Sequence, residues 1–556
     1  MGEGDGEQVV GRAVAAAVGA AQRLAEQAVG STRAVVELAR SGVVRPIRPD
    51  RILGMGGGLF RYGFTVAAGC AAGAARHPDR TAIVDEIGWL SYGELNRRTD
   101  RLARALAATG VGAGTSIGVL CRNHRGAVEV QVAAGKLGAD VLLLNTGLPA
   151  GQLASVADEL ELRTIVADSE FGEVLERVPR SCQIVTAWGA GPDDVALEEL
   201  IVRDGPDPLP LRPPPGRTIV LTSGTTGPPK GAMRPAPSSL TPIAAVLSAI
   251  PLRAGSPVLI AAPLLHTWGN AALQLALLHG SPIVLSRRFD PAEFVRTVER
   301  ERCDAVFAVP VMLQRVLELP PGELDDAWQQ HRPRIVAVSG SALPGSLAAA
   351  FMDRFGDVLY NLYGSTEVSW VSIAGPADLR AAPGTAGKAP AGTRLVVLDD
   401  DDEPVAPGTD GRIFVGNDMP FEGYTREGAD VERAAGLLGT GDVGHLDDDG
   451  RLHLTGRADD MIVSGGENIH PGPVEELLTA RPEVREAAVT GVDDDEYGQR
   501  LAAFVVLADG ASTSADDVRG WVRAGLSRFA VPRDVTFVDE LPRNATGKVV
   551  HRDLPT

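Results

Sequence analysis

The chain has 556 residues, more than one hydrophobic core usually holds, so several domains are expected. An apolar fraction of 44% and a charged fraction of 22% are typical of a globular enzyme and argue against a fibrous or disordered chain. The 53 basic and 72 acidic residues give a formal net charge of −19. Nucleic acid is therefore not an expected partner, although a local cationic pocket for a phosphate ligand remains compatible with this charge.

The cysteines and the apolar segments indicate the cellular compartment in which the protein is expected. Cys70, Cys121, Cys182 and Cys303 are far apart and form no C-x-x-C pair, so neither a disulfide framework nor a thiolate metal site is expected. No apolar run reaches ~18 residues, which argues against a membrane span. The acidic start MGEGDGE argues against a signal peptide. A reducing, cytoplasmic location fits these features.

Residues 1–60 are predicted to form a helical extension. Residues 10–42 are rich in alanine, and Val14, Val18 and Ala21 lie at helical spacing on one weakly apolar face. An arginine-rich segment precedes the stretch ILGMGGGLF at residues 52–60. Peripheral contact with an anionic membrane surface, such as the inner face of the plasma membrane, is one interpretation. Packing on the body of the protein is the other.

From residue 78 onward, predicted strands and helices alternate. Ser91 and Glu94 have the spacing of a capping box at the start of one helix. The expected strands are residues 81–86, 116–121, 140–145, 163–168 and 217–221, and the expected helices are residues 91–110, 127–137 and 152–160. This alternation predicts βαβ units in a mainly parallel sheet, with ligands bound at the carboxyl ends of its strands.

The composition changes along the rest of the chain. Residues 187–216 form a stiff connector rich in Gly, Pro and Asp, and the alternation of strands and helices returns at residues 257–363. After residue 384 short strands and turns dominate, and another compact αβ pattern begins near residue 460. The expected fold is α/β, with a large multi-subdomain N-terminal domain of mainly parallel sheets and a small β subdomain. A small α+β C-terminal domain follows it.

The loop SGTTGPPKG, residues 223–231, follows the expected strand 217–221 but is not a Walker A loop. Gly231 comes after Lys230 where Ser or Thr would bind magnesium, and two prolines remove backbone donors. The loop still offers hydroxyls, flexible glycines that approach a ligand closely, and a cation. These groups belong to Thr222, Ser223, Gly224, Thr225, Thr226, Gly227 and Lys230. A phosphate-binding loop of a different design is predicted.

Four further stretches stand out, although each alone is compatible with an ordinary structural role. They are APLLHTWGN (262–270), NLYGSTE (361–367), GTGDVGHLDDDGRLHLTGRADDMIVSGGENIHP (439–471) and RNATGKVV (543–550). In this order and spacing, the five stretches resemble the adenylate-forming superfamily of acyl-CoA synthetases, firefly luciferase and peptide-synthetase adenylation domains. The resemblance begins near residue 70 and reaches the C-terminus. RNHRG at residues 122–126 and ENIHP make the chain most similar to actinobacterial fatty acyl-CoA ligases.

The resemblance implies a reaction in two halves. The carboxylate of a fatty acid attacks the α-phosphate of magnesium-bound ATP, and an acyl-adenylate and pyrophosphate form. The thiol of coenzyme A then attacks the acyl carbonyl, and AMP leaves. The loop around Lys230 would be a mobile clamp on the β- and γ-phosphates. Cations are needed because the reaction brings two anions together.

The resemblance also assigns roles to single residues. Lys548 would bridge the carboxylate and the phosphate, Glu367 would hold magnesium together with Thr222, and Thr366 would contact the α-phosphate. His266 would lie by the acyl-carboxylate pocket and either orient the acid or gate the adenylate. The other expected nucleotide-binding residues are Ser339, Gly340, Ser341, Asn361, Tyr363, Gly364 and Ser365 at the base and its flank, and Asp442 and Arg457 at the ribose.

Rotation of a small C-terminal domain is implied between the two half-reactions. The expected division is an extension at residues 1–60, a large domain at 61–458 and a small domain at 459–556, with the hinge at Asp459. One orientation brings Lys548 to the site, and the other brings Gly465 and Gly466, which would let the thiol approach. Trp268 either shortens the acyl pocket or packs in the core.

Other functions remain open at the level of the sequence. Within the same chemistry, the acyl-adenylate could be delivered to a carrier protein instead of coenzyme A, or the acid could be non-fatty. A catalytically silent binding protein on the same scaffold is a different class, which the presence of Lys548, Glu367, Asp442 and Arg457 opposes.

Overall fold

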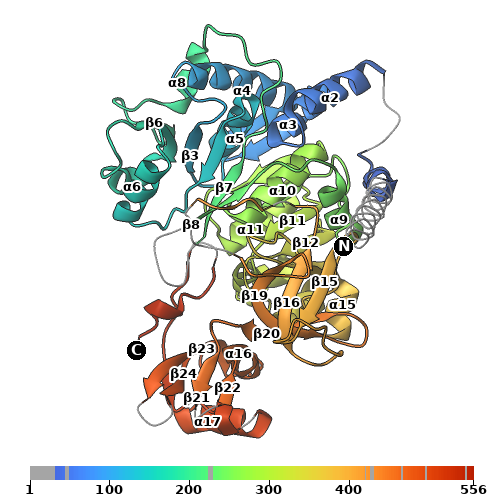
Figure 1. Cartoon of the computed structure of the whole chain (residues 1–556), viewed down its shortest axis with the longest axis vertical. Coiled ribbons are helices and arrows are strands. Elements are labelled where there is room, and N and C mark those ends of the chain that lie inside the picture. The colour runs from blue at the N-terminus through green and yellow to red at the C-terminus, as the bar shows by residue number, and fades with distance from the viewer. Residues whose placement is uncertain are drawn as a thin grey trace, which may run out of the picture.

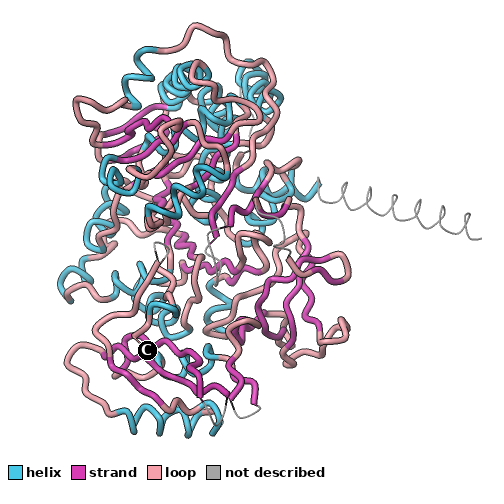
Figure 2. Tube along the Cα trace, turned by 60° about the vertical axis from the view of Figure 1, so that its left-hand side comes forward, coloured by secondary structure: helices cyan, strands magenta, loops and turns pink. Residues whose placement is uncertain are grey.

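A computed structural model describes residues 32–43, 49–222, 230–419, 421–425, 431–464, 467–494, 498–526, 528–544 and 547–555. Two large sheets and a small β sheet form the body, and a separate small sheet with its helices lies at the C-terminal end (Figures 1 and 2). This arrangement confirms the predicted fold class.

The first large sheet carries the predicted phosphate loop. Its strand order is β17 (Gly423–Tyr424), β8 (Lys230–Arg234), β7 (Thr218–Thr222), β4 (Asp140–Leu143), β3 (Ser116–Leu120), β5 (Thr164–Asp168) and β6 (Gln183–Trp188). The strands from β7 to β6 run parallel, whereas β8 and β17 are added antiparallel at one edge. The expected loop therefore leaves a buried strand and returns beside it as β8.

The second large sheet carries the YGSTE stretch. Its order is β14 (Ser372–Ala374), β13 (Leu359–Tyr363), β12 (Ile335–Val338), β11 (Ala305–Ala308), β9 (Val258–Ile260), β10 (Ile283–Leu285), β1 (Thr81–Asp85) and β2 (Gly88–Ser91). The strands from β13 to β1 are parallel, and β14 and β2 close the two edges antiparallel. Functional loops at the carboxyl ends of these strands are thus brought to one edge.

Helices from both sheets share one apolar core. This core contains residues of α3 (Val66–Arg76), α5 (Arg125–Leu137) and α10 (Thr267–Leu278) together with strands of both sheets. The other helices of the large domain are α2 (Pro49–Tyr62), α4 (Tyr92–Ala107), α6 (Ala150–Glu159), α7 (Gly172–Leu175), α8 (Leu197–Arg203), α9 (Thr241–Ala249), α11 (Pro291–Arg300), α12 (Pro310–Leu317), α13 (Pro321–Asp326), α14 (Gly345–Phe355) and α15 (Pro376–Ala381). The shared core fixes the two loop-bearing edges relative to each other.

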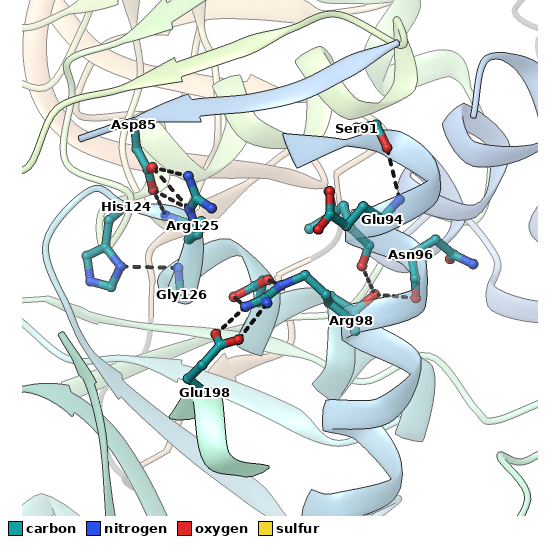
Figure 3. Close-up of polar contacts among 12 residues, drawn as sticks. Asp85, Ser91, Glu94, Asn96, Arg98, His124, Arg125, Gly126 and Glu198 are labelled. Carbon is teal, nitrogen blue, oxygen red and sulfur yellow. Dashed lines mark hydrogen bonds and ion pairs between the residues drawn. The ribbon is translucent and has the colours of Figure 1, made fainter. Parts of the chain in front are cut away.

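Polar ties complete the joint between the sheets (Figure 3). The Ser91 hydroxyl accepts from the Glu94 backbone N–H at 3.2 Å, as predicted for the start of α4. Arg125 at the start of α5 donates to the Asp85 carboxylate at the end of β1, one bond being 2.9 Å. Because Asp85 is buried, this partner is needed to keep its charge satisfied.

The small β sheet and the C-terminal domain complete the chain. The first contains β15 (Arg394–Leu398), β16 (Gly411–Gly416), β18 (Arg433–Ala434), β19 (Leu437–Leu446) and β20 (Leu452–Arg457). The second contains β21 (Ile462–Ser464), β22 (Glu467–Ile469), β23 (Val484–Asp494), β24 (Gly498–Leu507) and β25 (Asp534–Phe537), with α16 (Pro471–Thr479) and α17 (Ala515–Gly525). The predicted hinge, Asp459, lies in the short link between β20 and β21.

The C-terminal domain contacts the large domain close to Lys548. Glu486 on β23 accepts from Arg543 at 2.6 Å and from Gln314 of α12 at 3.4 Å. Gly547 lies against Val311, and a Cβ at this glycine would be 2.5 Å from the Val311 Cγ1. The segment before Lys548 therefore sits closely on α12.

Most of the predicted N-terminal extension, residues 1–31 and 44–48, lies outside the described residues. Helix α2 is tied to the connector, because Arg61 donates to the Pro210 carbonyl at 2.9 Å. Its Leu53 and Phe60 are 76% and 70% exposed. Among the described helices, none is long and apolar enough to cross a membrane. Peripheral membrane contact stays a prediction.

Trp328 should contribute strongly to stability. It is 2% exposed, and its ring centroid lies 4.5 Å from that of Phe355 on α14. We expect Trp328→Ala to lower the free energy of unfolding by about 3–5 kcal/mol, since it leaves a cavity in a packed aromatic cluster. Trp89 on β2 is 65% exposed, so Trp89→Ala should change stability by about 0.5 kcal/mol or less. Urea unfolding followed by circular dichroism measures both, and similar losses for both variants would contradict the assignment.

Candidate active site

One cavity of about 1390 Å³ lies where the two large sheets, the small sheet and the C-terminal domain meet. It brings together most of the predicted site residues that the structure describes. They are Lys230, His266, Ser339, Gly340, Ser341, Asn361, Tyr363, Gly364, Ser365, Thr366, Glu367, Asp442, Arg457 and Lys548. Thr222 ends β7 opposite Lys230, but nothing of its side chain is described. Ser223, Gly224, Thr225, Thr226 and Gly227, as well as Gly465 and Gly466, lie outside the described residues.

The Glu367 carboxylate is held by two hydroxyl groups at the wall of the cavity. The Ser365 hydroxyl donates to its Oε2 at 2.8 Å, and the Tyr424 hydroxyl donates to its Oε1 at 2.9 Å. The Lys230 ammonium lies 5.7 Å from the centroid of the Tyr424 ring. A hard carboxylate oxygen fixed beside a cation fits a magnesium–triphosphate complex, because Mg²⁺ is usually held by one or two carboxylates and substrate phosphates.

The YGSTE turn needs a glycine. A Cβ at Gly364 would overlap the carbonyl oxygen of Ser369, so the turn closes only without a side chain there. Next along the turn, the hydroxyl of Thr366 lies 3.2 Å from that of Thr267 at the start of α10. The predicted α-phosphate contact is thereby joined to the element that carries His266.

Asp442 and Arg457 face each other on the paired strands β19 and β20. The Arg457 Nη1 lies 3.6 Å from Asp442 Oδ1, and its Nε lies 2.7 Å from Asp459 Oδ1. Burial raises the pKa of Asp442, and the Tyr363 hydroxyl, which donates to Oδ2, counteracts that rise together with the nearby cations. A carboxylate and a guanidinium at one rim suit the two hydroxyls of a ribose.

His266 caps α10 and is held neutral. Its Nε2 is buried and has no hydrogen-bond partner among the described residues. Burial lowers the pKa of this imidazole to about 4. An uncharged ring with an unsatisfied nitrogen can hydrogen-bond a substrate carboxylate or adenylate without adding charge.

Trp268 forms a fixed wall of the cavity and also belongs to the core. Its indole N–H donates to the Ala308 carbonyl at 3.0 Å, and its ring centroid lies 5.0 Å from that of Phe307. The residue is 7% exposed and lines the cavity. Core packing of Trp268 is therefore confirmed, whereas its shortening of the acyl pocket stays a prediction.

Lys548 reaches the cavity from the C-terminal domain. A short turn presents it, in which the Lys548 backbone N–H donates to the Asn544 side chain at 3.0 Å and the Asn544 N–H donates to the Lys548 carbonyl at 2.9 Å. Burial raises the pKa of Asp442 and the charge of Lys548 counteracts that rise, while at Asp459 Lys548 adds to the effect of Arg457, which lowers the pKa. In the orientation of the structure, Lys548 thus lines the cavity together with Asp442.

Cys121, His124 and Asp168 form a second group of potential metal ligands, with ligand atoms within 4.8 Å of one another. The Gly126 backbone N–H donates to His124 Nδ1 at 3.1 Å (Figure 3). The proton therefore sits on Nε2, which donates to Asp168 Oδ1 at 2.7 Å. Since both ring nitrogens are in use, His124 ties α5 to β5 and offers no lone pair to a metal.

The family model for AMP-binding enzymes matches residues 70–425. The chain belongs to the AMP-binding enzyme family. The model for the C-terminal domain of these enzymes matches residues 473–548, which includes Lys548.

The 2-succinylbenzoate–CoA ligase of Geobacillus kaustophilus is 32% identical over 480 residues, covering 86% of this chain and 95% of the relative. The feruloyl-CoA synthase of an Amycolatopsis species is 35% identical over 490 residues, covering 86% and 96%. The chain is also similar to the solved o-succinylbenzoate CoA synthetase of Bacillus subtilis bound to its acyl-adenylate, with a TM-score of 0.75, 26% identity, and 88% and 98% of the chains covered. An AMP-forming CoA ligase that acts through an acyl-adenylate is supported.

Two cavity residues were missed by the sequence interpretation. The sequence interpretation assigned no role to Tyr424 in the segment FEGYT, residues 421–425. Pairing of β17 with β8 brings its hydroxyl to Glu367. Arg234 ends β8, is 6% exposed, and donates to the Thr366 carbonyl at 2.6 Å. Side chains alternate between the two faces of a strand, so Lys230 and Arg234 lie on the same face of β8. This alternation is the sequence signal that could have indicated Arg234 as a cavity residue.

Removing the Tyr363 hydroxyl should shift the acid limb of activity. The hydroxyl stabilises the charged form of Asp442, so Tyr363→Phe raises the Asp442 pKa further. If the ionised carboxylate binds ribose, the acid limb of kcat/KM for ATP in pyrophosphate exchange moves to higher pH. Tyr92→Phe, which removes a buried hydroxyl bonded to the Ser281 carbonyl, should leave that limb in place. An unmoved limb in Tyr363→Phe would show that Asp442 does not titrate in this step.

Proposed function

We propose that the protein is a magnesium- and ATP-dependent ligase that converts a carboxylic acid with an apolar body into its CoA thioester through an acyl-adenylate. The observation that carries this proposal is that Lys548, Glu367, Asp442 and Arg457, from three separate parts of the chain, line one cavity. Each has the chemistry that one portion of the reacting complex requires.

In the first half-reaction the acid's carboxylate oxygen would attack the α-phosphorus as pyrophosphate leaves. Lys548 places a positive charge where the two anions approach each other. Glu367 would hold magnesium, which offsets charge on the phosphate oxygens. Neutral His266 would hydrogen-bond the acid, and Thr366 the α-phosphate. The Ser223–Gly227 hydroxyls and glycines and Lys230 are proposed as the clamp on the leaving phosphates.

The acid itself is proposed from the cavity wall and the relatives. Ile243, Val246, Trp268 and Val309 line the cavity with apolar surface, which suits an alkyl or aryl body. The relatives named above act on succinylbenzoate and form feruloyl-CoA. The fatty acid predicted from the sequence therefore stands beside aryl acids as a class to be compared.

In the second half-reaction the C-terminal domain would turn about Asp459 and bring Gly465 and Gly466 to the site for the thiol of coenzyme A. A carrier protein remains the alternative acceptor. An amide bond synthetase of Marinactinospora thermotolerans shares the fold, with a TM-score of 0.77 and 28% identity over 87% of this chain. Because CoA ligases and an amide bond synthetase share this fold, the acceptor of the acyl group must be measured directly.

Lys548→Ala tests the first half-reaction. We expect ATP–pyrophosphate exchange, run with a panel of alkyl, aryl and amino acids, to fall by about 10²–10³-fold, because one preorganised charge is lost from the transition state. Lys388→Ala removes an exposed lysine of the large domain and should keep the wild-type rate. Full exchange in Lys548→Ala would refute the proposed role.

Wild-type enzyme with coenzyme A then identifies the acceptor. Release of AMP together with an acyl-CoA product supports the ligase. Adenylation without any thioester product would favour the carrier-protein alternative.

A further inference from the structure

Arg234 is a buried cation for which the mechanism above has no use. The side chain is 6% exposed and lines the active-site cavity. Its guanidinium donates to the Thr366 carbonyl at 2.6 Å and to the Ser369 hydroxyl, both of which are neutral. Among the described residues, Glu367 is the carboxylate whose charge acts on Arg234, and it forms no ion pair with it. Burying a charge without a counter-charge is costly, so an anion at this place would be strongly favoured.

The nearest carboxylate does not meet that need. Glu367 is close enough for its charge to favour the charged form of Arg234. Both of its oxygens are nevertheless occupied, Oε2 by Ser365 and Oε1 by Tyr424. Glu367 therefore forms hydrogen bonds with Ser365 and Tyr424 and leaves Arg234 without a carboxylate partner among the described residues.

A purely structural role for Arg234 is also insufficient. The segment around Ser369, which has a positive φ of 66°, is held by Asn417. The Asn417 amide donates to the carbonyls of Val368 at 2.7 Å and Trp370 at 2.9 Å. A neutral donor would satisfy the Thr366 carbonyl as well as a guanidinium does, without the cost of a buried charge.

The position of Arg234 points to the acid and away from the triphosphate tail. Lys230 and Arg234 lie on one face of β8, and four residues of strand separate their Cα atoms by ~13 Å. Lys230 lies at the Glu367 end, where the β- and γ-phosphates are expected. Arg234 touches the residue expected at the α-phosphate, and Thr366 in turn meets Thr267 beside His266. The far side of the α-phosphate is where the acid must enter.

We propose that Arg234 is a specificity-determining residue that binds a second anionic group, a carboxylate or sulfonate, on the acid substrate. This inference rests on the proposed function and narrows its substrate class. The reacting carboxylate would go to Lys548 and His266, and the second anion would form a charge-assisted bond with Arg234. An acid without that group would leave the guanidinium desolvated and unpaired, which disfavours plain fatty acids.

Matched pairs of acids test this directly. The pairs are pentanoate with glutarate, octanoate with suberate, and phenylacetate with 4-carboxyphenylacetate. ATP–pyrophosphate exchange gives kcat/KM for each acid, and the increase in Tm on adding each acid reports binding without chemistry. We expect the wild type to prefer the dianionic acid in at least one pair by both readouts.

Arg234→Met should remove that preference. We expect kcat/KM for the preferred diacid to fall by about 30-fold or more, as for truncation of one partner of a buried charge pair, while its monoacid changes much less. Arg234→Lys should recover part of the preference, because it keeps the charge and loses the planar fork. Arg217→Met is the matched control: Arg217 also lines the cavity but is paired with Glu422 at 2.7 Å, so the preference should persist.

The outcomes separate the two proposals. Diacid preference in the Tm measurement without exchange for any acid would retain Arg234 as an anion site and refute the ligase. Exchange in which the wild type uses both members of every pair equally would retain the ligase and overturn the Arg234 proposal. Equal losses for monoacid and diacid in Arg234→Met would make Arg234 a structural clamp. A higher KM for ATP in Arg234→Met, with unchanged acid preference, would show that the Arg234 charge acts on the triphosphate. Either this result or equal losses for monoacid and diacid would overturn the proposal.

Discussion

Electrostatic repulsion between the two anionic substrates is the constraint on which the arrangement of the cavity depends. A carboxylate and a triphosphate must meet in a cavity that excludes much of the water, where charges interact more strongly than in solution. Lys230 and Arg234 come from β8, Arg457 from the small β sheet and Lys548 from another domain. The net charge of −19 makes this local gathering of cations a property of the fold and not of the composition.

The same constraint explains why acidic groups in the cavity are so firmly held. Glu367 and Asp442 each receive a tyrosine hydroxyl, from Tyr424 and Tyr363. A hydroxyl donor gives each carboxylate a defined orientation without placing a positive charge beside it. Arg457 also lies beside Asp442, with its Nη1 3.6 Å from Oδ1, so this carboxylate is held from two sides.

Much of this could be predicted from the sequence, because the signals are local. The β-branched run before the loop gave β7, and Ser91 marked the start of α4. The motif residues that are described lie around one cavity, since parallel strands place their carboxyl ends at a common edge.

Tyr424 and Arg234 could not be found in the same way. The role of each depends on a pairing between segments distant in sequence: β17 with β8 for Tyr424, and β8 with the YGSTE turn for Arg234. The identity of the acid substrate cannot be predicted from the sequence for a similar reason. The residues that line the cavity, among them Ile243, Trp268 and Val309, come from separate parts of the chain. No spacing rule within one segment encodes the depth of a pocket built in this way.

Gly547 lets the C-terminal domain lie closely against α12 in this structure. Because its α-carbon rests on Val311, any side chain at this position would hold the C-terminal domain away from α12 by the width of that group. Lys548 is the next residue, so it would retreat from the phosphate by a similar amount, and Coulomb attraction weakens as charges separate. The absence of one methyl group at this position thus limits how closely the Lys548 segment can lie against the large domain.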